Sequence, residues 1–378
     1  MKLEDYTNSV VTVVSLAMLQ SIHIPHVRLR NGALLYLVLL VTVLAFFEFC
    51  KGLTQLYIWR GYTSPRRTPP SVNLVLAGMA SLDYSWTSSL EIPRMEVIPY
   101  IADDQTAPFH PPANKGNEAI MYFTYMYEFY DKLPDISIFI HGTDMQWHVE
   151  PILDGSTSYA LTHLDLNEVL RRQYLNLGLS WQFACPNWIN TSITENSPDF
   201  NPNLKSEEPW VKQAFIDNFP NDPVPEILSA PCCSQFAVTK EAIHLLPRKQ
   251  YQKSINWIMN THLPDAHSGR VWEHFWQWMF LQKAVDCPEE FKALCRNYHI
   301  CFESEAEWEE WKKKDRKKRE LVASKKAALE GKIEENKPDT SDLSWAIAAL
   351  SGELEAGKQR AMERGRDEKM KNRLAGEL

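Results

Sequence analysis

The sequence lacks the short motifs that identify several large classes of enzyme. It has no GxSxG motif, so a serine nucleophile of the α/β-hydrolase type is not indicated. It also has no glycine-rich phosphate loop of the P-loop type and no internal repeat. Its formal net charge of −8 over 378 residues is not that of a strongly basic nucleic-acid-binding protein. Any contact with nucleic acid would therefore depend on a local patch.

The cysteines form neither a regular framework nor a zinc motif. There are seven of them, an odd number, and none belongs to a CxxC pair. Cys232 and Cys233 are adjacent and could in principle oxidise, but buried free thiols are the simpler expectation. The sequence therefore predicts neither a disulfide scaffold nor a structural zinc site.

An uncharged apolar run follows a short N-terminal segment, residues 1–30. Residues 31–47 hold no charge, and aromatic residues suited to a membrane interface follow them. We expect a single-pass transmembrane anchor over residues 31–59 and a proline-rich linker over residues 60–71; a buried core helix is the alternative. Basic residues on both flanks slightly favour a cytosolic catalytic domain.

Residues 72–302 have the element order of an α/β domain. Apolar runs predict strands at residues 72–80, 95–102 and 135–142, and an amphipathic pattern predicts a helix over residues 114–133. Further helices are expected at residues 165–177 and 268–285, and a long loop with seven prolines at residues 196–231. We expect one α/β domain with a mostly parallel sheet flanked by helices. A charged helical or disordered tail should occupy residues 303–378.

The first candidate site lies just after the third expected strand, in "HGTDMQWH". Ligands gather beyond the carboxyl ends of parallel strands, which draws attention to His141, Asp144 and His148. These are also zinc or iron ligand types, but their spacing is not diagnostic, so no metal site is predicted. The expected roles are proton transfer by a histidine and binding of a cationic group by Asp144.

Two further groups of polar residues complete the candidate site. Glu273 and His274 lie in an otherwise apolar helix, where burial is costly unless the pair is functional or joins a network with Arg270. Lys115 and Glu118 stand near a helix N-terminus, where they would hold an anion or cap the helix. Glu273 is the preferred catalytic base, with His141 and His274 as the other catalytic candidates.

Three ordered blocks carry a resemblance to a known family. "NKGNEAIMYFTYMYEFYDKLPDISIFIHGTDMQWH", "APCCSQFAVTKEAI" and "SGRVWEHFWQWMF" resemble a fungal family of unknown function that includes arginine-containing cyclodipeptide synthases. The resemblance implies a tRNA-dependent enzyme with a glycosyltransferase-like α/β core. It would condense arginyl-tRNA with a second aminoacyl-tRNA into a diketopiperazine, without a cofactor or an obligate protein partner.

Under this resemblance, Glu273 or His141 would deprotonate the attacking amine and Asp144 would pair with the guanidinium of arginine. The basic stretch over residues 312–319 would contact tRNA phosphates. The sequence departs from the family at Gln173 and Gly178, which puts the substrate in doubt.

Two alternatives remain open on the same residues. A membrane-anchored, nucleotide-sugar-dependent glycosyltransferase fits the element order, the anchor and a strand-end acidic residue, and a non-enzymatic scaffold would use the charged tail. A glycan on Asn190, the first residue of an Asn-Thr-Ser sequon, would place the domain in a lumen and favour sugar transfer.

Overall fold

The computed structural model describes residues 41–46, 68–182, 184–330 and 340–376. The chain divides into two compact units, Met1–Pro65 and Arg66–Leu378. Within the first unit only residues 41–46 are described, and they are helical. Most of the expected anchor, residues 31–59, therefore lies outside the described residues, as does the segment 1–30. No helix in the described part of the chain is long and apolar enough to cross a membrane, which leaves the anchor unsupported.

A five-stranded sheet forms the centre of the second unit, with the strand order β2-β1-β3-β7-β4. Its strands are β1 (Val72–Gly78), β2 (Met95–Ile101), β3 (Ile136–His141), β4 (Tyr174–Asn176) and β7 (Phe236–Thr239). β1 pairs in parallel with both β2 and β3, and all seven of its residues are buried. This central position explains why its sequence, apart from Asn73, is apolar rather than alternating. The first three expected strands are thus confirmed.

The sheet is mixed, which corrects the expectation of a mostly parallel one. β7 runs antiparallel to β3 on one side and to β4 on the other. Its four residues are all buried, and an apolar run of this length does not encode the direction in which it pairs. A separate two-stranded sheet joins β5 (Ile189–Asn190) to β6 (Ile227–Leu228).

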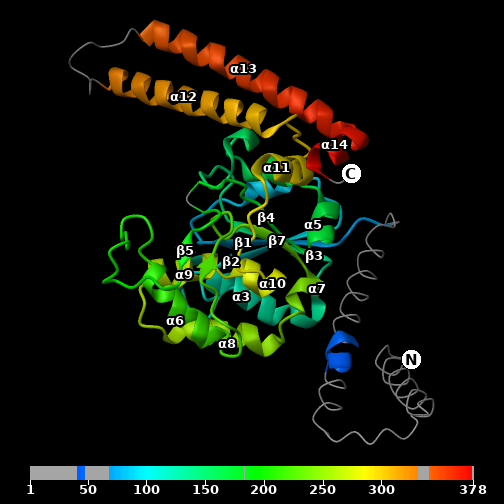
Figure 1. Ribbon diagram of the computed structural model, residues 1–378, viewed down its shortest axis with the longest axis vertical. Coiled ribbons are helices and arrows are strands. Elements are labelled where there is room, and N and C mark those ends of the chain that lie inside the picture. The colour runs from blue at the N-terminus through cyan, green and yellow to red at the C-terminus, as the bar shows by residue number, and fades with distance from the viewer. Residues whose placement is uncertain (1–40, 47–67, 183, 331–339, 377–378) are drawn as a thin grey trace, which may run out of the picture. The chain divides into compact units, whose positions relative to one another are not determined.

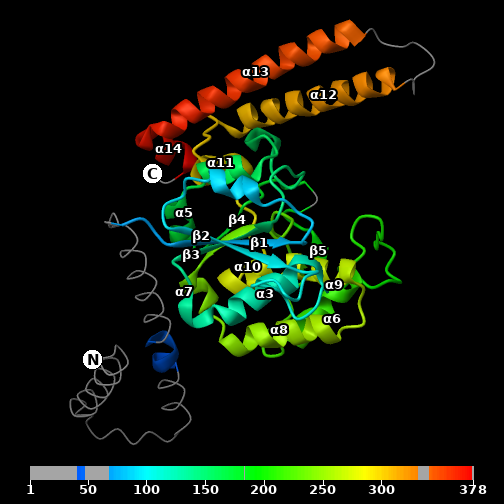
Figure 2. The same cartoon turned by 180° about the vertical axis from the view of Figure 1, so that it is seen from behind.

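Helices cover both faces of the main sheet (Figure 1). One face carries α3 and α10, with α6 and α8 farther out, and the opposite side carries α5 and α11; Figure 2 shows the same layers from behind. The helices of this part are α3 (Asn117–Glu128), α4 (Thr157–His163), α5 (Leu166–Arg172), α6 (Glu208–Asn218), α7 (Lys240–Ile243), α8 (Arg248–Asn260), α9 (Asp265–Glu273), α10 (Trp276–Leu281) and α11 (Glu290–Tyr298).

Aromatic side chains fill the layer between the sheet and α3, α9 and α10. The rings of Phe123 and Trp272 meet edge to face with centroids 4.5 Å apart, and Trp276 lies 5.0 Å from Phe236 on β7. All four side chains are at most 1% exposed. Because large aromatic groups bury much apolar area in specific geometries, this layer fixes how α3 and α9 sit against the sheet.

The charged tail is folded helix rather than disordered chain over its described residues. It forms α12 (Glu305–Leu329), α13 (Thr340–Arg366) and α14 (Glu368–Ala375), and α12 and α13 lie side by side in both views (Figures 1 and 2). α14 returns to α11, where Leu374 and Ala375 pack against Cys295 and Cys301. The tail therefore belongs to the same compact unit as the sheet.

Candidate active site

The histidines of the "HGTDMQWH" segment meet at the carboxyl end of β3. His141 is the last residue of that strand, and its Nδ1 lies 3.2 Å from Nδ1 of His148. Its Nε2 lies 4.0 Å from Oε2 of Glu118, a residue of the first turn of α3. Both side chains of this His–Glu pair are only partly accessible, 23% and 12%. The structure thus brings three of the predicted residues into one chain of contacts.

His148 is held in its neutral form at ordinary pH. Burial and then the nearby charge of His141 lower the pKa of His148 to about 4. A neutral imidazole can accept a proton or donate one from its other nitrogen, depending on its tautomer. Of the two histidines, His141 is the one whose second nitrogen faces a carboxylate.

Glu273 belongs to the same region, as the last residue of α9. Burial raises the pKa of Glu273 well above its usual range, and the negative charges of Glu118 and Glu207 raise it further, against a smaller opposite effect of Arg270. A raised pKa makes the carboxylate a stronger base, which is the property that a general base uses.

Tyr122, one turn after Glu118 on α3, was not singled out from the sequence. Its ring is fully buried, and its hydroxyl finds no hydrogen-bond partner among the described residues. Burial, followed by the charges of Glu118 and Glu273, raises the pKa of Tyr122 well above its usual range. Both carboxylates therefore act on this phenol, which marks a polar spot in an otherwise aromatic layer. In sequence, the tyrosine is indistinguishable from a core residue.

Close approach of α9 to α3 makes this arrangement possible. A Cβ atom on Gly269 would lie 3.0 Å from the carbonyl oxygen of Gly116 and 2.7 Å from Nδ2 of Asn117. Glycine is thus the residue that lets α9 contact the N-terminus of α3. One turn farther along α9 stands Glu273, and one residue beyond Asn117 stands Glu118.

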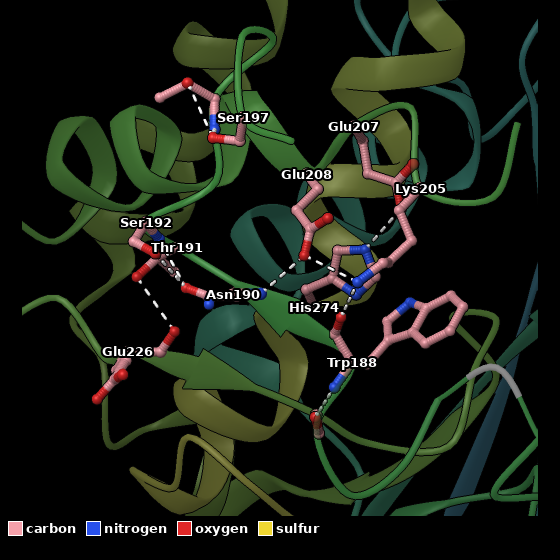
Figure 3. A network of polar contacts seen from close by, with 12 residues as sticks. Trp188, Asn190, Thr191, Ser192, Ser197, Lys205, Glu207, Glu208, Glu226 and His274 are labelled. Atoms are coloured by element: carbon pink, nitrogen blue, oxygen red, sulfur yellow. Dashed lines mark hydrogen bonds and ion pairs between the residues drawn. The ribbon is translucent and has the colours of Figure 1, made fainter. Parts of the chain in front are cut away.

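His274 and Arg270 form a network with Glu207. Nε2 of His274 lies 3.0 Å from Oε1 of Glu207, and Nη1 of Arg270 lies 3.9 Å from Oε2 of the same carboxylate. Figure 3 shows His274 and Glu207 beside the ion pair of Lys205 with Glu208, which is 3.0 Å long. Burial acts to raise the pKa of Glu207, but the hydrogen bond and charge of His274 lower it overall. This network anchors α9 to the segment before α6.

Asp144 and Lys115 make contacts that support local structure. Oδ1 of Asp144 accepts hydrogen bonds from Ser158 N at 2.7 Å and from Ser156 Oγ at 3.1 Å, at the start of α4. Nζ of Lys115 donates to the carbonyl oxygens of Thr261 at 2.8 Å and Met259 at 3.3 Å, at the end of α8. Such contacts satisfy helix-terminal groups. The substrate contacts expected of Asp144 and Lys115 stay predictions.

Two glutamines that the sequence did not single out tie the site together. Nε2 of Gln146 donates to Oε1 of Gln235 at 3.1 Å, and the same oxygen accepts from the backbone N–H of His141 at 3.4 Å. Gln235 immediately precedes β7, so these bonds join the ends of β3 and β7. In the described ranges, no group of three or more His, Cys, Asp or Glu could hold a metal ion.

The cysteines correct the expectation of free thiols. Disulfides join Cys185 to Cys287, Cys232 to Cys233, and Cys295 to Cys301. The first closes a sequence separation of 102 residues, which no local spacing rule reveals. All six cysteines of the described ranges are therefore paired, and Cys50 lies outside those ranges.

Comparison with known proteins identifies a family but no activity. Residues 74–296, more than half of the chain, match the family described as "Protein of unknown function (DUF3431)". No curated protein and no solved structure matches the chain. The match supports a family of unknown function, as expected from the ordered blocks, and does not link it to cyclodipeptide synthases. The chain belongs to the DUF3431 family.

Proposed function

We propose that the second unit is a group-transfer enzyme in which Glu273 is the general base. The observation that carries this proposal is the His141–His148 pair beside Glu118 at the carboxyl end of β3, with Glu273 of α9 near enough for its charge to act on Tyr122. Titratable groups with shifted pKa values that gather at the carboxyl end of parallel strands are typical of catalytic sites.

Under this proposal each group has a separate task. Glu273 takes the proton of the attacking hydroxyl or amine, and its raised pKa brings its basicity closer to that of the proton donor. His141, held between Glu118 and His148, relays a proton or donates one to the leaving group. The buried Tyr122 hydroxyl, which lacks a protein partner in the described structure, is available to donate to a reacting oxygen.

Of the possible transfers, we place sugar transfer from a nucleotide-linked donor first. The reason is the state of the cysteines: disulfides persist in secretory and extracellular compartments and are rare in the cytosol. Nucleotide sugars serve transferases in the secretory pathway, whereas aminoacyl-tRNA is a cytosolic substrate. The long-range Cys185–Cys287 bridge thus favours the first donor.

The test is a donor screen with the full chain. Purified protein is incubated with a panel of nucleotide sugars, with and without Mn²⁺, and release of nucleoside diphosphate is measured. The Glu273→Gln variant should lower the rate about 10²- to 10⁴-fold, the usual contribution of a general base. The control is Glu195→Gln, the same change at an exposed glutamate, which should leave the rate unchanged. Equal rates for both variants would show that the base is elsewhere.

Aminoacyl transfer to give an arginine-containing diketopiperazine is the second candidate. The observation in its favour is that Lys312, Arg316 and Arg319 of α12 line a cavity that also includes His148, so tRNA phosphates could bind next to the cluster. Extracts of an expressing host, with wild-type protein and with Glu273→Gln, would be searched for a new diketopiperazine. Well-expressed wild-type protein that yields none argues against this candidate, and a glycan on Asn190 would exclude it.

A further inference from the structure

A cavity beside the histidine pair has a lining of basic and aromatic side chains together with two carboxylates, Glu150 and Asp315. It measures about 320 Å³ and lies between α12 and the loops that follow β3 and β4. Its walls include Trp147 and His148 on the first loop, Ser180 on the second, and Arg316 and Arg319 on α12. α12 lies beyond the residues that match the family, so this wall is an addition to the family domain.

Two guanidinium groups of α12 are available at this cavity. Arg316 is exposed and makes no ion pair with any described residue. Arg319 contacts Asp315 through Nε at 2.9 Å, which leaves its terminal nitrogens for another acceptor. The two arginines are three residues apart, so they share one side of the helix. A forked pair of this kind suits the oxygens of a phosphate or diphosphate.

The opposite wall presents an exposed aromatic ring. Trp147 is 80% exposed, although tryptophan side chains are large and on average highly buried. Its ring lies 3.9 Å, centroid to centroid, from that of His148, so one of its faces is supported by the protein. Flat bases stack on such rings, and each base contributes to binding without hydrogen bonds to its edges.

We propose that this cavity binds the nucleoside diphosphate part of a donor, with the phosphates on Arg316 and Arg319 and the base on Trp147. A free phosphate would use the arginines alone and leave the tryptophan without a role. One wall of the cavity adjoins the catalytic candidates, because His148 lines it and lies 3.2 Å from His141. A group attached to the diphosphate would therefore extend toward Glu118. The position of the attached group rests on the proposed function, whereas the binding of the nucleoside diphosphate does not.

The experiment is a titration of the full chain with UDP, GDP and ADP by calorimetry, with uridine and inorganic pyrophosphate as partial probes. At least one diphosphate should bind more tightly than either partial probe. The Arg316→Ala/Arg319→Ala double variant should weaken that binding about tenfold or more, and Trp147→Ala about fivefold or more. The control is Lys313→Ala, which removes a charge from an exposed position on the same helix that does not line the cavity. It should bind as wild type does.

The outcomes separate the cavity from the catalytic proposal. Glu273→Gln should bind the diphosphate as tightly as wild type, because the base does not touch the cavity walls. Arginine-dependent binding without any sugar transfer would retain the cavity and refute the function. Sugar transfer with a KM unchanged in the double variant would refute the cavity alone. Absence of diphosphate binding at millimolar concentration, or binding only of an RNA oligonucleotide that diphosphates do not displace, would also overturn the inference.

Discussion

Replacement of Gly269 by alanine tests whether the contact between α9 and α3 builds the site. The added Cβ would stand 3.0 Å from Gly116 O and 3.0 Å from Asn117 Cβ. Non-bonded carbon atoms are normally about 3.5–4.0 Å apart, so α9 must move by roughly half an ångström. The receiving backbone cannot yield easily, because Gly116 and Asn117 both have left-handed backbone angles, with φ of 70° and 52°.

The magnitude follows from two opposing effects. Overpacking of this kind typically costs about 1–3 kcal/mol. Alanine in a helix gains about 0.5–1 kcal/mol over glycine. Gly352 in α13 supplies the matched control, since a Cβ there would meet nothing within 4 Å. The helix-propensity gain is common to both variants, so their difference of about 1–3 kcal/mol measures the clash alone.

Urea unfolding of the full chain, followed by circular dichroism, supplies the assay. Gly269→Ala should have a lower midpoint than wild type, and Gly352→Ala should have an equal or higher one. Activity should also fall in Gly269→Ala, because α9 carries Glu273 away from Glu118. A midpoint for Gly269→Ala at or above that of Gly352→Ala would refute the argument that this close approach is tightly packed.

Three further predictions concern the same unit. Glu273→Gln should gain stability over wild type as pH rises above the ordinary pKa of a glutamate, about 4.3. The raised pKa means that the wild-type native state retains a proton that the unfolded chain releases, so its stability is lost as pH rises; parallel melting curves would contradict this. Cys287→Ser, which opens the bridge to Cys185, should cost about 2–5 kcal/mol in unfolding experiments without reductant, and an unchanged free energy of unfolding would contradict the pairing. Tyr122→Phe should change stability by less than about 1 kcal/mol, since the hydroxyl it removes has no partner in the described structure, while slowing transfer; a large destabilisation would reveal a hidden partner.

The strands with long apolar runs could be predicted, and the shortest ones, β4, β5 and β6, could not. β1 and β3 read directly as buried strands. β4, with three residues, lay within the expected helix over residues 165–177; that helix ends at Arg172, and Gln173 has a positive φ of 68°. The expected helix over residues 268–285 is interrupted between α9 and α10, at His274 and Phe275. Tertiary packing determines where these helices break, and the helix propensities of the local residues do not reveal it.

The site was predicted in part, and for physical reasons. His141 and His148 follow a strand, so their position at the sheet edge could be inferred. Glu273 stood out because a carboxyl in an apolar helix is costly. Asp144 has the residue type of a ligand-binding group, and its carboxylate accepts a hydrogen bond at the start of α4. Helix ends and binding sites use the same residue types, so the sequence does not separate the two roles. The cysteine pairs stayed hidden because pairing depends on spatial distance rather than spacing along the chain.

The return of α14 to α11 has a practical consequence for anyone who expresses this family segment alone. A recombinant fragment that stopped at residue 296 would end inside α11, between Cys295 and its partner Cys301. It would also lose Trp308, whose indole N–H donates to Glu290 at 2.8 Å, and the contact of Arg296 with Ala375. The family match therefore covers a shorter segment than the folded unit. A fragment is better ended after residue 376.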